Sequence, residues 1–318
     1  MNAGAEVSIV IPIKGRPELF AETARSLVGQ SLPNWEAIVV DDGSQAGDLS
    51  RIAGIAAADS RFRLMANPGR RGASACRNAG LRAGTGGLVI FLDSDDALAP
   101  TCLQRRTAVM AADPRLDFAV FPTLRFNQVP GDSDLPWYPL TSEDDLDRFL
   151  AGPSPWQTTG PVWRRASLAR VGPWDEQALS WQDWEFHVRA LSLGLRYTKM
   201  EGPDSYWRTP SPASISRMAH SRRYIANRVR LYFRIVALLR SRGALTVRRR
   251  RILARHFFGY AFRSGQPRKR ALQFWSLGRR SGVVSALDFI FMLACEPVVR
   301  NRERLGRVFE NALYPDGP

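Results

Sequence analysis

Two short apolar runs in the first hundred residues end directly in carboxylates. One run leads into VVDDGS at 39–44, and the other leads into FLDSDD at 91–96. Such runs are typical of buried strands in a parallel sheet. Ligands of open α/β sheets bind at the carboxyl ends of the strands. We therefore expect both acidic clusters to lie along one edge of a sheet.

Several carboxylates this close together repel one another unless a cation or hydrogen-bond donors neutralise them. A hard divalent cation is the natural partner, because Mg²⁺ or Mn²⁺ commonly bridges such carboxylates to a diphosphate. The alternative is that each aspartate caps the helix that follows its strand. Because the pattern occurs twice, we prefer a ligand site to two helix caps.

Segments that we expect to be strands alternate with segments that we expect to be helices. The expected strands are 7–11, 36–40, 62–65, 88–92, 117–121 and 195–200. The expected helices are one that opens at Pro17 and others over 48–58, 72–83, 98–112 and 182–193. Loops are expected at 128–141 and 152–159. This alternation predicts an α/β fold with a Rossmann-related, mostly parallel sheet flanked by helices.

The charge of the chain divides it into two parts. Residues 1–216 carry 22 Lys and Arg against 25 Asp and Glu, whereas 217–318 carry 23 against 5. We therefore expect a catalytic or binding domain over 1–216 and an arginine-rich helical region over 217–318. Amphipathic helical spacing at 222–240, the arginine run 248–251 and the apolar stretch 283–299 favour peripheral association with an anionic membrane.

The cysteines and the N-terminus bear on localisation. Cys76, Cys102 and Cys295 have neither metal nor disulfide spacing, which favours a reducing compartment. The first residues lack the pattern of a signal peptide. The longest charge-free part of 283–299 is too short to span a bilayer. We expect a cytoplasmic protein that lies on the inner face of the cell membrane.

The ordered set of motifs resembles the family 2 glycosyltransferases, which are inverting, metal-dependent enzymes with the GT-A fold. The resemblance covers about 1–216. The matching segments are VSIVIP at 7–12, RPEL at 16–19, SL at 26–27, QS at 30–31, VVDDGS at 39–44, RNAG at 77–80, FLDSDD at 91–96, GPWDE at 172–176, QDW at 182–184 and SIS at 214–216. The order and spacing of these segments make the set specific.

The resemblance implies a role for each matching position. It implies a nucleotide-diphosphate sugar donor, with a uracil-type base held by Asp42 and also by Asp41, and a ribose contact from Asp93 or Asp95. It implies Mn²⁺ or Mg²⁺ at Asp95 or Asp96 and a general base at Asp183. The further expected nucleotide contacts are Pro12, Lys14, Arg71 and Arg77.

Two positions depart from the family pattern. Ile13-Lys14-Gly15 stands where the family often has an aromatic–Asn pair, so Lys14 is a candidate phosphate contact instead of a stacking ring. The segment before 214–216 lacks the histidine that the family often has there. His220 is a candidate third metal ligand, and its alternative is a surface residue that opens a helix.

Other side chains have both functional and structural interpretations. Asp183 could cap the following helix, and Glu185 is then the second candidate base. Trp156, Trp163 and Trp174 could stack on an acceptor sugar, but packing in the core is the more common role for such residues. Carboxylate chemistry suffices for a single inverting displacement, which fits the absence of a Ser/His/Asp or Cys/His constellation in the sequence.

We expect an inverting glycosyltransferase, of the hexosyltransferase type, that acts on a saccharide or lipid-linked acceptor in cell-surface polysaccharide synthesis. One alternative is a basic protein that binds nucleic acid through 217–318, although no nucleic-acid-binding motif is present. The other is a non-catalytic membrane adaptor. Neither alternative accounts for the carboxylates at both strand ends, so we expect no nucleic-acid partner. The sequence leaves the sugar, the acceptor and the oligomeric state open.

Overall fold

The computed structural model describes residues 5–152, 154–209 and 222–254, together with 276, 278–280, 282–285 and 290. The chain divides into two compact units. The first comprises Met1–Phe149 and Pro153–Leu231, and the second comprises Leu150–Gly152 and Tyr232–Pro318. The first unit thus extends beyond the expected boundary at 216 and includes the start of a long C-terminal helix.

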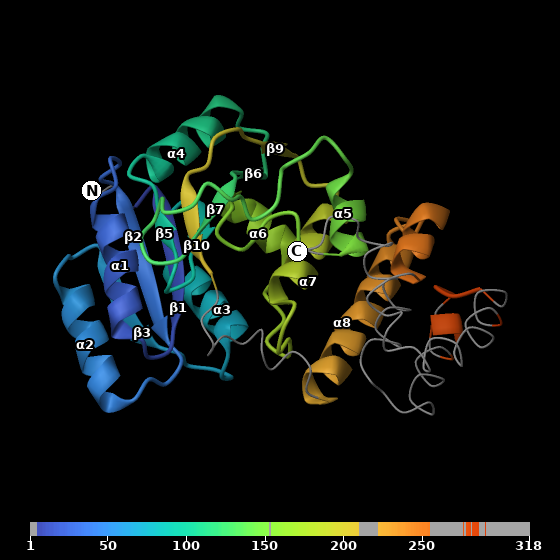
Figure 1. The fold of residues 1–318 in the computed structure, drawn as a ribbon, viewed down its shortest axis with the longest axis horizontal. Coiled ribbons are helices and arrows are strands. Elements are labelled where there is room, and N and C mark those ends of the chain that lie inside the picture. Colours follow the sequence, from blue (N-terminus) through green and yellow to red (C-terminus); the bar gives the residue numbers. More distant parts are fainter. Residues whose placement is uncertain are drawn as a thin grey trace. The chain divides into compact units, whose positions relative to one another are not determined.

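A seven-stranded sheet forms the centre of the first unit (Figure 1). Its strands, in spatial order, are β3 (Phe62–Ala66), β2 (Trp35–Asp41), β1 (Val7–Ile13), β4 (Leu88–Phe91), β8 (Pro161–Arg164), β6 (Phe118–Val120) and β9 (Tyr197–Lys199). All neighbouring strands are parallel except that β8 runs antiparallel to both β4 and β6. This confirms the expected α/β fold with a mostly parallel sheet.

The parallel register brings the two acidic segments to the same edge of the sheet. Ile13 at the end of β1 pairs with Asp41 on β2, and Val10 of β1 pairs with Phe91 at the end of β4. Because β1 lies between β2 and β4, the segments that follow both neighbours emerge on either side of it. The prediction of a shared edge is therefore confirmed.

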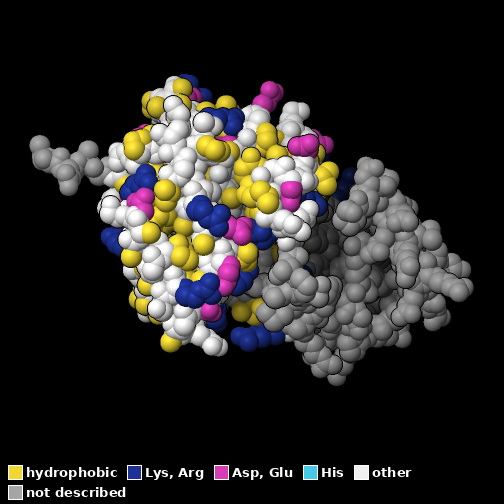
Figure 2. All heavy atoms as spheres, turned by 60° about the vertical axis from the view of Figure 1, so that its left-hand side comes forward, with side chains coloured by type: hydrophobic (Ala, Val, Ile, Leu, Met, Phe, Trp, Pro, Cys, Tyr) yellow, Lys and Arg dark blue, Asp and Glu magenta, His cyan; other side chains and the backbone are white. Residues whose placement is uncertain are grey.

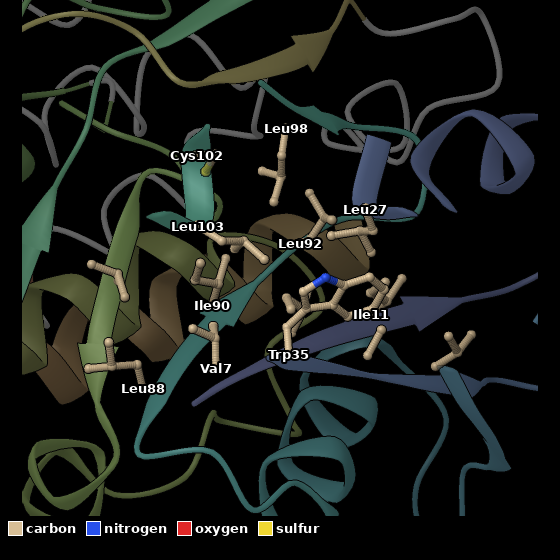
Figure 3. Close-up of a cluster of buried hydrophobic side chains, with 14 of the residues drawn as sticks. Val7, Ile11, Leu27, Trp35, Leu88, Ile90, Leu92, Leu98, Cys102 and Leu103 are labelled. Atoms are coloured by element: carbon tan, nitrogen blue, oxygen red, sulfur yellow. The ribbon is translucent and has the colours of Figure 1, made fainter. Parts of the chain in front are cut away.

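Helices cover both faces of the sheet. The labelled helices of the described residues are α1 (Pro17–Val28), α2 (Ala46–Ala57), α3 (Ala73–Ala83), α4 (Cys102–Ala112), α5 (Asp145–Ala151), α6 (Arg165–Val171), α7 (Gln182–Leu191) and α8 (Arg222–Ser241), and α8 runs from the first unit into the second. Figure 3 shows Ile11, Ile90 and Leu27 in the main buried cluster, which includes residues of α1 and α4. Ile38 and Val40 pack instead with α3, because successive strand residues point to opposite faces.

Gly80 allows α3 to approach the sheet closely. A Cβ atom at Gly80 would lie 2.4 Å from Cγ1 of Val10 and 3.3 Å from Cγ2 of Val40, which is closer than real Cβ contacts. The RNAG segment at 77–80 therefore has a packing reason for its glycine. The same close approach fixes Arg77, which lies one turn earlier on α3.

A smaller sheet of three strands was not expected from the sequence. Its order is β5 (Ala97–Leu98), β10 (Ser205–Arg208) and β7 (Thr123–Phe126). The helix expected over 98–112 begins only at Cys102, because Ala97–Leu98 is extended and pairs with β10. The expectation of a helix from residue 98 was therefore wrong.

A buried ion pair joins α4 to the segment before β10. Arg106 and Asp204 are fully buried and form two hydrogen bonds, of 3.0 and 2.7 Å. The remaining guanidinium nitrogen of Arg106 donates to the carbonyl of Thr159 at 2.7 Å. Arg106 therefore fixes the loop before β8 to the smaller sheet.

The described part of the basic C-terminal region contains two helices longer than one turn. α8 covers the whole range expected over 222–240 and one further residue, and residues 247–254 form a further short helix. Among the described residues, no helix combines the length and apolar character needed to cross a membrane. The SIS segment at 214–216, His220 and most of 283–299 lie outside the described residues.

Candidate active site

The two aspartates at the end of β2 have different environments. Asp41 is buried, and its carboxylate accepts hydrogen bonds from the backbone N–H of Gly43 (3.0 Å) and Ser44 (3.1 Å) and from the Ser44 hydroxyl. Asp42 is half-buried and accepts both the N–H of Gly72, at 3.0 Å, and the Asn67 amide, at 2.8 Å. Asp41 thus shapes the turn, whereas Asp42 lies nearer the surface.

Three other expected nucleotide contacts surround this turn. Pro12 is buried within β1, and Lys14 is exposed just beyond it. The Arg71 guanidinium lies directly over Gly43, where a Cβ atom would be 2.2 Å from Nη1. Gly43 has φ +86°, a conformation that favours glycine. Arg71 therefore covers the turn that follows Asp42, and Lys14 lies exposed just after β1.

The aspartates after β4 also differ in burial, because Asp93 and Asp95 are partly exposed whereas Asp96 is buried. Asp93 pairs with Nη2 of Arg77 at 2.7 Å, and Asp95 pairs with Nη1 of Arg16 at 2.9 Å. The side chains of Asp93 and Asp95 are 35% and 28% exposed. Burial and the nearby charge of Asp93 raise the pKa of Asp95. Two partly exposed carboxylates therefore lie close together at the end of β4.

Asp96 points into the protein instead. Its carboxylate accepts the backbone N–H of Arg208 (3.1 Å), the Thr159 hydroxyl (3.3 Å) and the Gln157 amide (3.4 Å). The side chain is buried, and burial followed by the charges of Asp93 and Asp95 raises its pKa well above the usual value. Asp96 therefore connects the β4 edge to β10 and to the loop before β8.

These partners of Asp96 were missed by reasoning from the sequence. Arg208 donates from Nε to the carbonyl of Asp95, and its Nη2 forms an ion pair with Glu22 of α1. Gln157 and Thr159 lie in the loop expected at 152–159, where their polarity was the only sequence signal. The contacts of Arg208 bridge up to 186 residues of chain.

Arg77 joins the β4 edge to the start of α7. Besides Asp93, its guanidinium donates to Oε1 of Gln182 at 3.0 Å. It also lies over the ring of Trp174, 4.7 Å from the centroid. The side chain of Arg77 is only 6% exposed. The buried guanidinium of Arg77 thus links Asp93 to Gln182, the residue just before Asp183.

Asp183 lies in the first turn of α7. Its pKa is raised, chiefly because burial disfavours the charged form; the Asp93 charge adds to this, whereas the Trp184 N–H and the Arg77 charge oppose it. The N-cap of α7 is Trp181, which makes no side-chain cap hydrogen bond. Asp183 is therefore not the N-cap residue, although its carboxylate accepts the first-turn N–H of Trp184. Glu185, the second candidate base, is buried and paired with Arg189 at 2.9 Å.

The tryptophans singled out in the sequence are core residues. Trp156, Trp163 and Trp174 are at most 3% exposed, so the acceptor-platform interpretation is wrong and the core interpretation holds. Trp163 stacks on His187, whose pKa burial lowers to about 3. His187 is therefore neutral and part of the core. Partly exposed rings are found instead at Trp181, Trp137 and Trp207.

The residues after β4 fit a divalent cation. Asp93 and Asp95 offer hard oxygen donors, and their mutual repulsion is offset by one charge each from Arg77 and Arg16. Among the described residues, no group of three or more His, Cys, Asp or Glu side chains is arranged to hold a metal. Two protein carboxylates, completed by phosphate oxygens and water, are the usual coordination for Mg²⁺ in nucleotide sites.

A family model described as glycosyl transferase family 2 matches residues 8–170, which is more than half of the chain. The matched region contains β1, β2 and β4 and both acidic segments.

Curated relatives match over shorter segments. The chain is 33% identical over 104 residues to UDP-Glc:alpha-D-GlcNAc-diphosphoundecaprenol beta-1,3-glucosyltransferase WfgD of Escherichia coli, which covers 33% of this chain and 40% of the relative. It is 26% identical over 205 residues to the amylovoran biosynthesis glycosyltransferase AmsB of Erwinia amylovora, covering 62% of this chain and 67% of the relative. The match to WfgD thus spans less than half of that relative.

Solved structures share the fold. TarS 1-349 of S. aureus in complex with UDP-GlcNAc superposes with a TM-score of 0.66 and 18% identity, covering 85% of this chain and 78% of TarS. The mannosyltransferase PcManGT of Pyrobaculum calidifontis, in complex with GDP-Man and Mn²⁺, gives a TM-score of 0.55 and 17% identity, covering 95% and 89%. At these identities the likeness establishes the fold, which is GT-A-like as expected.

Proposed function

The chain belongs to glycosyl transferase family 2, and we propose that it transfers a hexose from a uridine-diphosphate sugar to a hydroxyl of a saccharide or lipid-linked acceptor, with inversion at the anomeric carbon. The observation that carries this proposal is the position of Arg77. Its guanidinium bonds Asp93, which follows β4, and Gln182, which precedes Asp183. One side chain therefore links the end of β4, where the donor is proposed to bind, to the segment of the candidate base.

In this proposal Asp183 acts as the general base. The acceptor hydroxyl attacks the anomeric carbon, the bond from that carbon to the diphosphate oxygen breaks, and the hydroxyl proton passes to the Asp183 carboxylate. The raised pKa of Asp183 makes its carboxylate a better proton acceptor than an exposed aspartate. One displacement inverts the configuration and needs no covalent intermediate.

The donor lies along the carboxyl ends of β1, β2 and β4. In this proposal the half-buried Asp42 accepts the N3–H of the uracil, and Lys14 and Arg71 bind the diphosphate; the exposure of Lys14 and the place of Arg71 over Gly43 support these roles. Asp93 and Asp95, in place of the buried Asp96, would hold Mn²⁺ or Mg²⁺. When bound, this cation stabilises the negative charge that gathers on the leaving diphosphate.

The printed names of the relatives support the choice of substrates. WfgD is described as using UDP-Glc and a diphosphoundecaprenol acceptor, and TarS was solved with UDP-GlcNAc. AmsB is described as acting in amylovoran biosynthesis. We therefore propose a role for this chain in the synthesis of a cell-surface polysaccharide.

Peripheral association with an anionic membrane on the cytoplasmic side is part of the same proposal. Val247 is 64% exposed, and it begins the short helix at 247–254. Arg248, Arg250 and Arg251 on that helix are also exposed. An exposed apolar residue next to several arginines is suited to the interface of anionic lipids.

Replacement of the base tests the proposed reaction. Asp183→Asn keeps the shape of the side chain but cannot accept the proton. We expect kcat for uridine diphosphate release from a UDP-hexose, with a panel of saccharide acceptors, to fall on the order of 10²- to 10⁴-fold. We expect the Kd for uridine diphosphate to stay the same. Turnover near that of the unaltered chain would assign the base to another residue.

Arg82→Gln is the matched control for this variant. Arg82 is exposed on α3 and lies away from the end of the helix that carries Arg77. Its replacement should leave both kcat and the Kd for uridine diphosphate unchanged.

A further inference from the structure

The segment that leads into α7 has a backbone conformation that needs support. Trp181 has φ 60° and ψ 28°, which is the left-handed region, and it directly precedes Gln182 and Asp183. Among the described residues, only Arg16 shares a positive φ without being glycine. A bulky residue in this region is strained by about 1 kcal/mol or more. Contacts around 175–181 must therefore hold Trp181 in place.

One side of this segment is held by α3. Asn78 donates to the carbonyl of Trp174 at 3.0 Å and to Oε1 of Glu176 at 2.9 Å, and it accepts the N–H of Trp174 at 2.8 Å. The neighbouring Arg77 bonds Gln182. These contacts secure the two ends of the segment but do not reach 177–181.

The other side is held by the first half of α8, which belongs to the first unit. Asn227 uses both groups of its amide. It accepts the N–H of Leu179 at 2.8 Å and donates to the carbonyl of Gln177 at 2.7 Å. This pair of bonds replaces the backbone partners that a strand would supply. Asn227 therefore fixes the path of the main chain four residues before Asp183.

The next residues of α8 extend this support to Trp181. Arg228 donates from Nε to the Ser180 hydroxyl at 2.9 Å, and its guanidinium lies 5.1 Å from the centroid of the Trp181 ring. Arg230 pairs with Asp175 at 3.0 Å. Three residues within one turn of a helix thus contact the segment along its length, and Arg228 reaches the strained Trp181 itself.

We propose that Asn227 and Arg228 are positioning residues for the general base, and that α8 is therefore part of the catalytic apparatus. The inference rests on the proposed function of Asp183. Asn227 and Arg228 act through the backbone of 177–181, which sets the direction in which the first turn of α7 begins. A shift of about 1 Å in a reacting group can cost on the order of 10²-fold in rate.

The test uses the full chain and compares substitutions on one helix. Asn227→Ala removes both backbone contacts, and Ser180→Ala removes the Arg228 hydrogen bond by a change too small to prevent folding. The matched control is Arg223→Ala, which alters an exposed side chain one turn before Asn227. We expect Asn227→Ala to lower kcat by roughly 10- to 100-fold and Ser180→Ala by a smaller factor. The Kd for uridine diphosphate should stay within about twofold.

The pH profile separates positioning from a general loss of structure. Among the described residues outside α7, Arg77 and Asp93 are the charged groups that shift the pKa of Asp183. If 177–181 loosens, water reaches Asp183 and its pKa falls towards the usual value. The acid limb of kcat/KM for Asn227→Ala should therefore move to lower pH. An unmoved limb, or a kcat within about twofold of the unaltered chain for both variants, would overturn the proposal.

A double variant distinguishes failure of this inference from failure of the proposed function. If Asn227 acts through Asp183, then Asn227→Ala combined with Asp183→Asn should be no slower than Asp183→Asn alone. Losses that multiply in the double variant would mean that Asn227 acts elsewhere, while Asp183 remains the base. If Asp183→Asn alone leaves turnover unchanged, the proposed function fails first.

Discussion

The guanidinium of Arg77 contacts groups that are far apart in the sequence. Asp93 lies 16 residues away and Gln182 lies 105 residues away. Because Arg77 is buried, water screens its bonds less than it would at an exposed guanidinium, although the Asp93 carboxylate is partly exposed. The β4 edge and the segment that carries the proposed base are consequently linked through one side chain.

The pKa of Asp183 predicts the acid limit of activity. The carboxylate must be deprotonated to accept the acceptor proton, and burial raises its pKa. Activity should therefore fall as the pH drops through a value above that of an ordinary aspartate. The measurement is kcat/KM with a UDP-hexose from pH about 4 to about 9. A profile that is flat down to pH about 4 would contradict this assignment.

Neighbouring carboxylates cannot be told apart from the sequence alone. Asp95 and Asp96 are both acidic residues after an apolar strand, so either could hold a cation. The burial of Asp96 depends on contacts with Gln157, Thr159 and Arg208, which lie more than 60 residues away. The general position of the site could be predicted, whereas the orientation of each carboxylate could not.

At the scale of helices and strands, the segments that the sequence predicted best are those buried on both faces. β1, β2 and β4 are apolar at nearly every position, because both sides pack against helices. β10 is not predictable in this way, since Ser205–Arg208 mixes polar and aromatic residues. Its strand conformation depends on pairing with β5 and β7, about a hundred and about eighty residues earlier.

The ion pair between α4 and the segment before β10 should contribute strongly to stability. Asp204→Asn leaves the Arg106 guanidinium buried without its counter-charge. We expect the free energy of unfolding to fall by about 3 to 5 kcal/mol, measured from the urea denaturation midpoint. The control is Asp113→Asn, which removes the charge of an exposed pair with Arg115 and should change the midpoint little. Equal midpoints for both variants would contradict the structural role of Arg106 and Asp204.

At the scale of the whole molecule, charge separates two parts of the chain. Basic and acidic side chains are interspersed on the face of the first unit in Figure 2, in keeping with the near-balance of charges over 1–216. The excess of arginine lies after residue 216. An anionic surface should therefore be recognised by the C-terminal region and not by the nucleotide-binding edge.

Vesicle binding tests this division. Each basic residue near an anionic leaflet contributes roughly 1 kcal/mol, and salt screens the attraction. We expect the chain to sediment with anionic vesicles, less so at high salt, and Arg250→Glu with Arg251→Glu to weaken binding. The same reversals at Arg25 and Arg82 on the first unit should have little effect. Equal binding to neutral vesicles, or tighter binding to duplex DNA, would argue against the membrane proposal.

The central claim is that the carboxyl ends of β2 and β4 bind a uridine diphosphate with a divalent cation. Isothermal titration of the full chain with uridine diphosphate, with and without Mn²⁺, tests it most directly. Asp95→Asn and Asp96→Asn serve as a matched pair, because only Asp95 is partly exposed.

We predict Mn²⁺-dependent binding that Asp95→Asn weakens by at least about tenfold and that Asp96→Asn largely retains, with guanosine diphosphate binding more weakly. Binding that is unaffected both by Mn²⁺ and by Asp95→Asn would contradict the account.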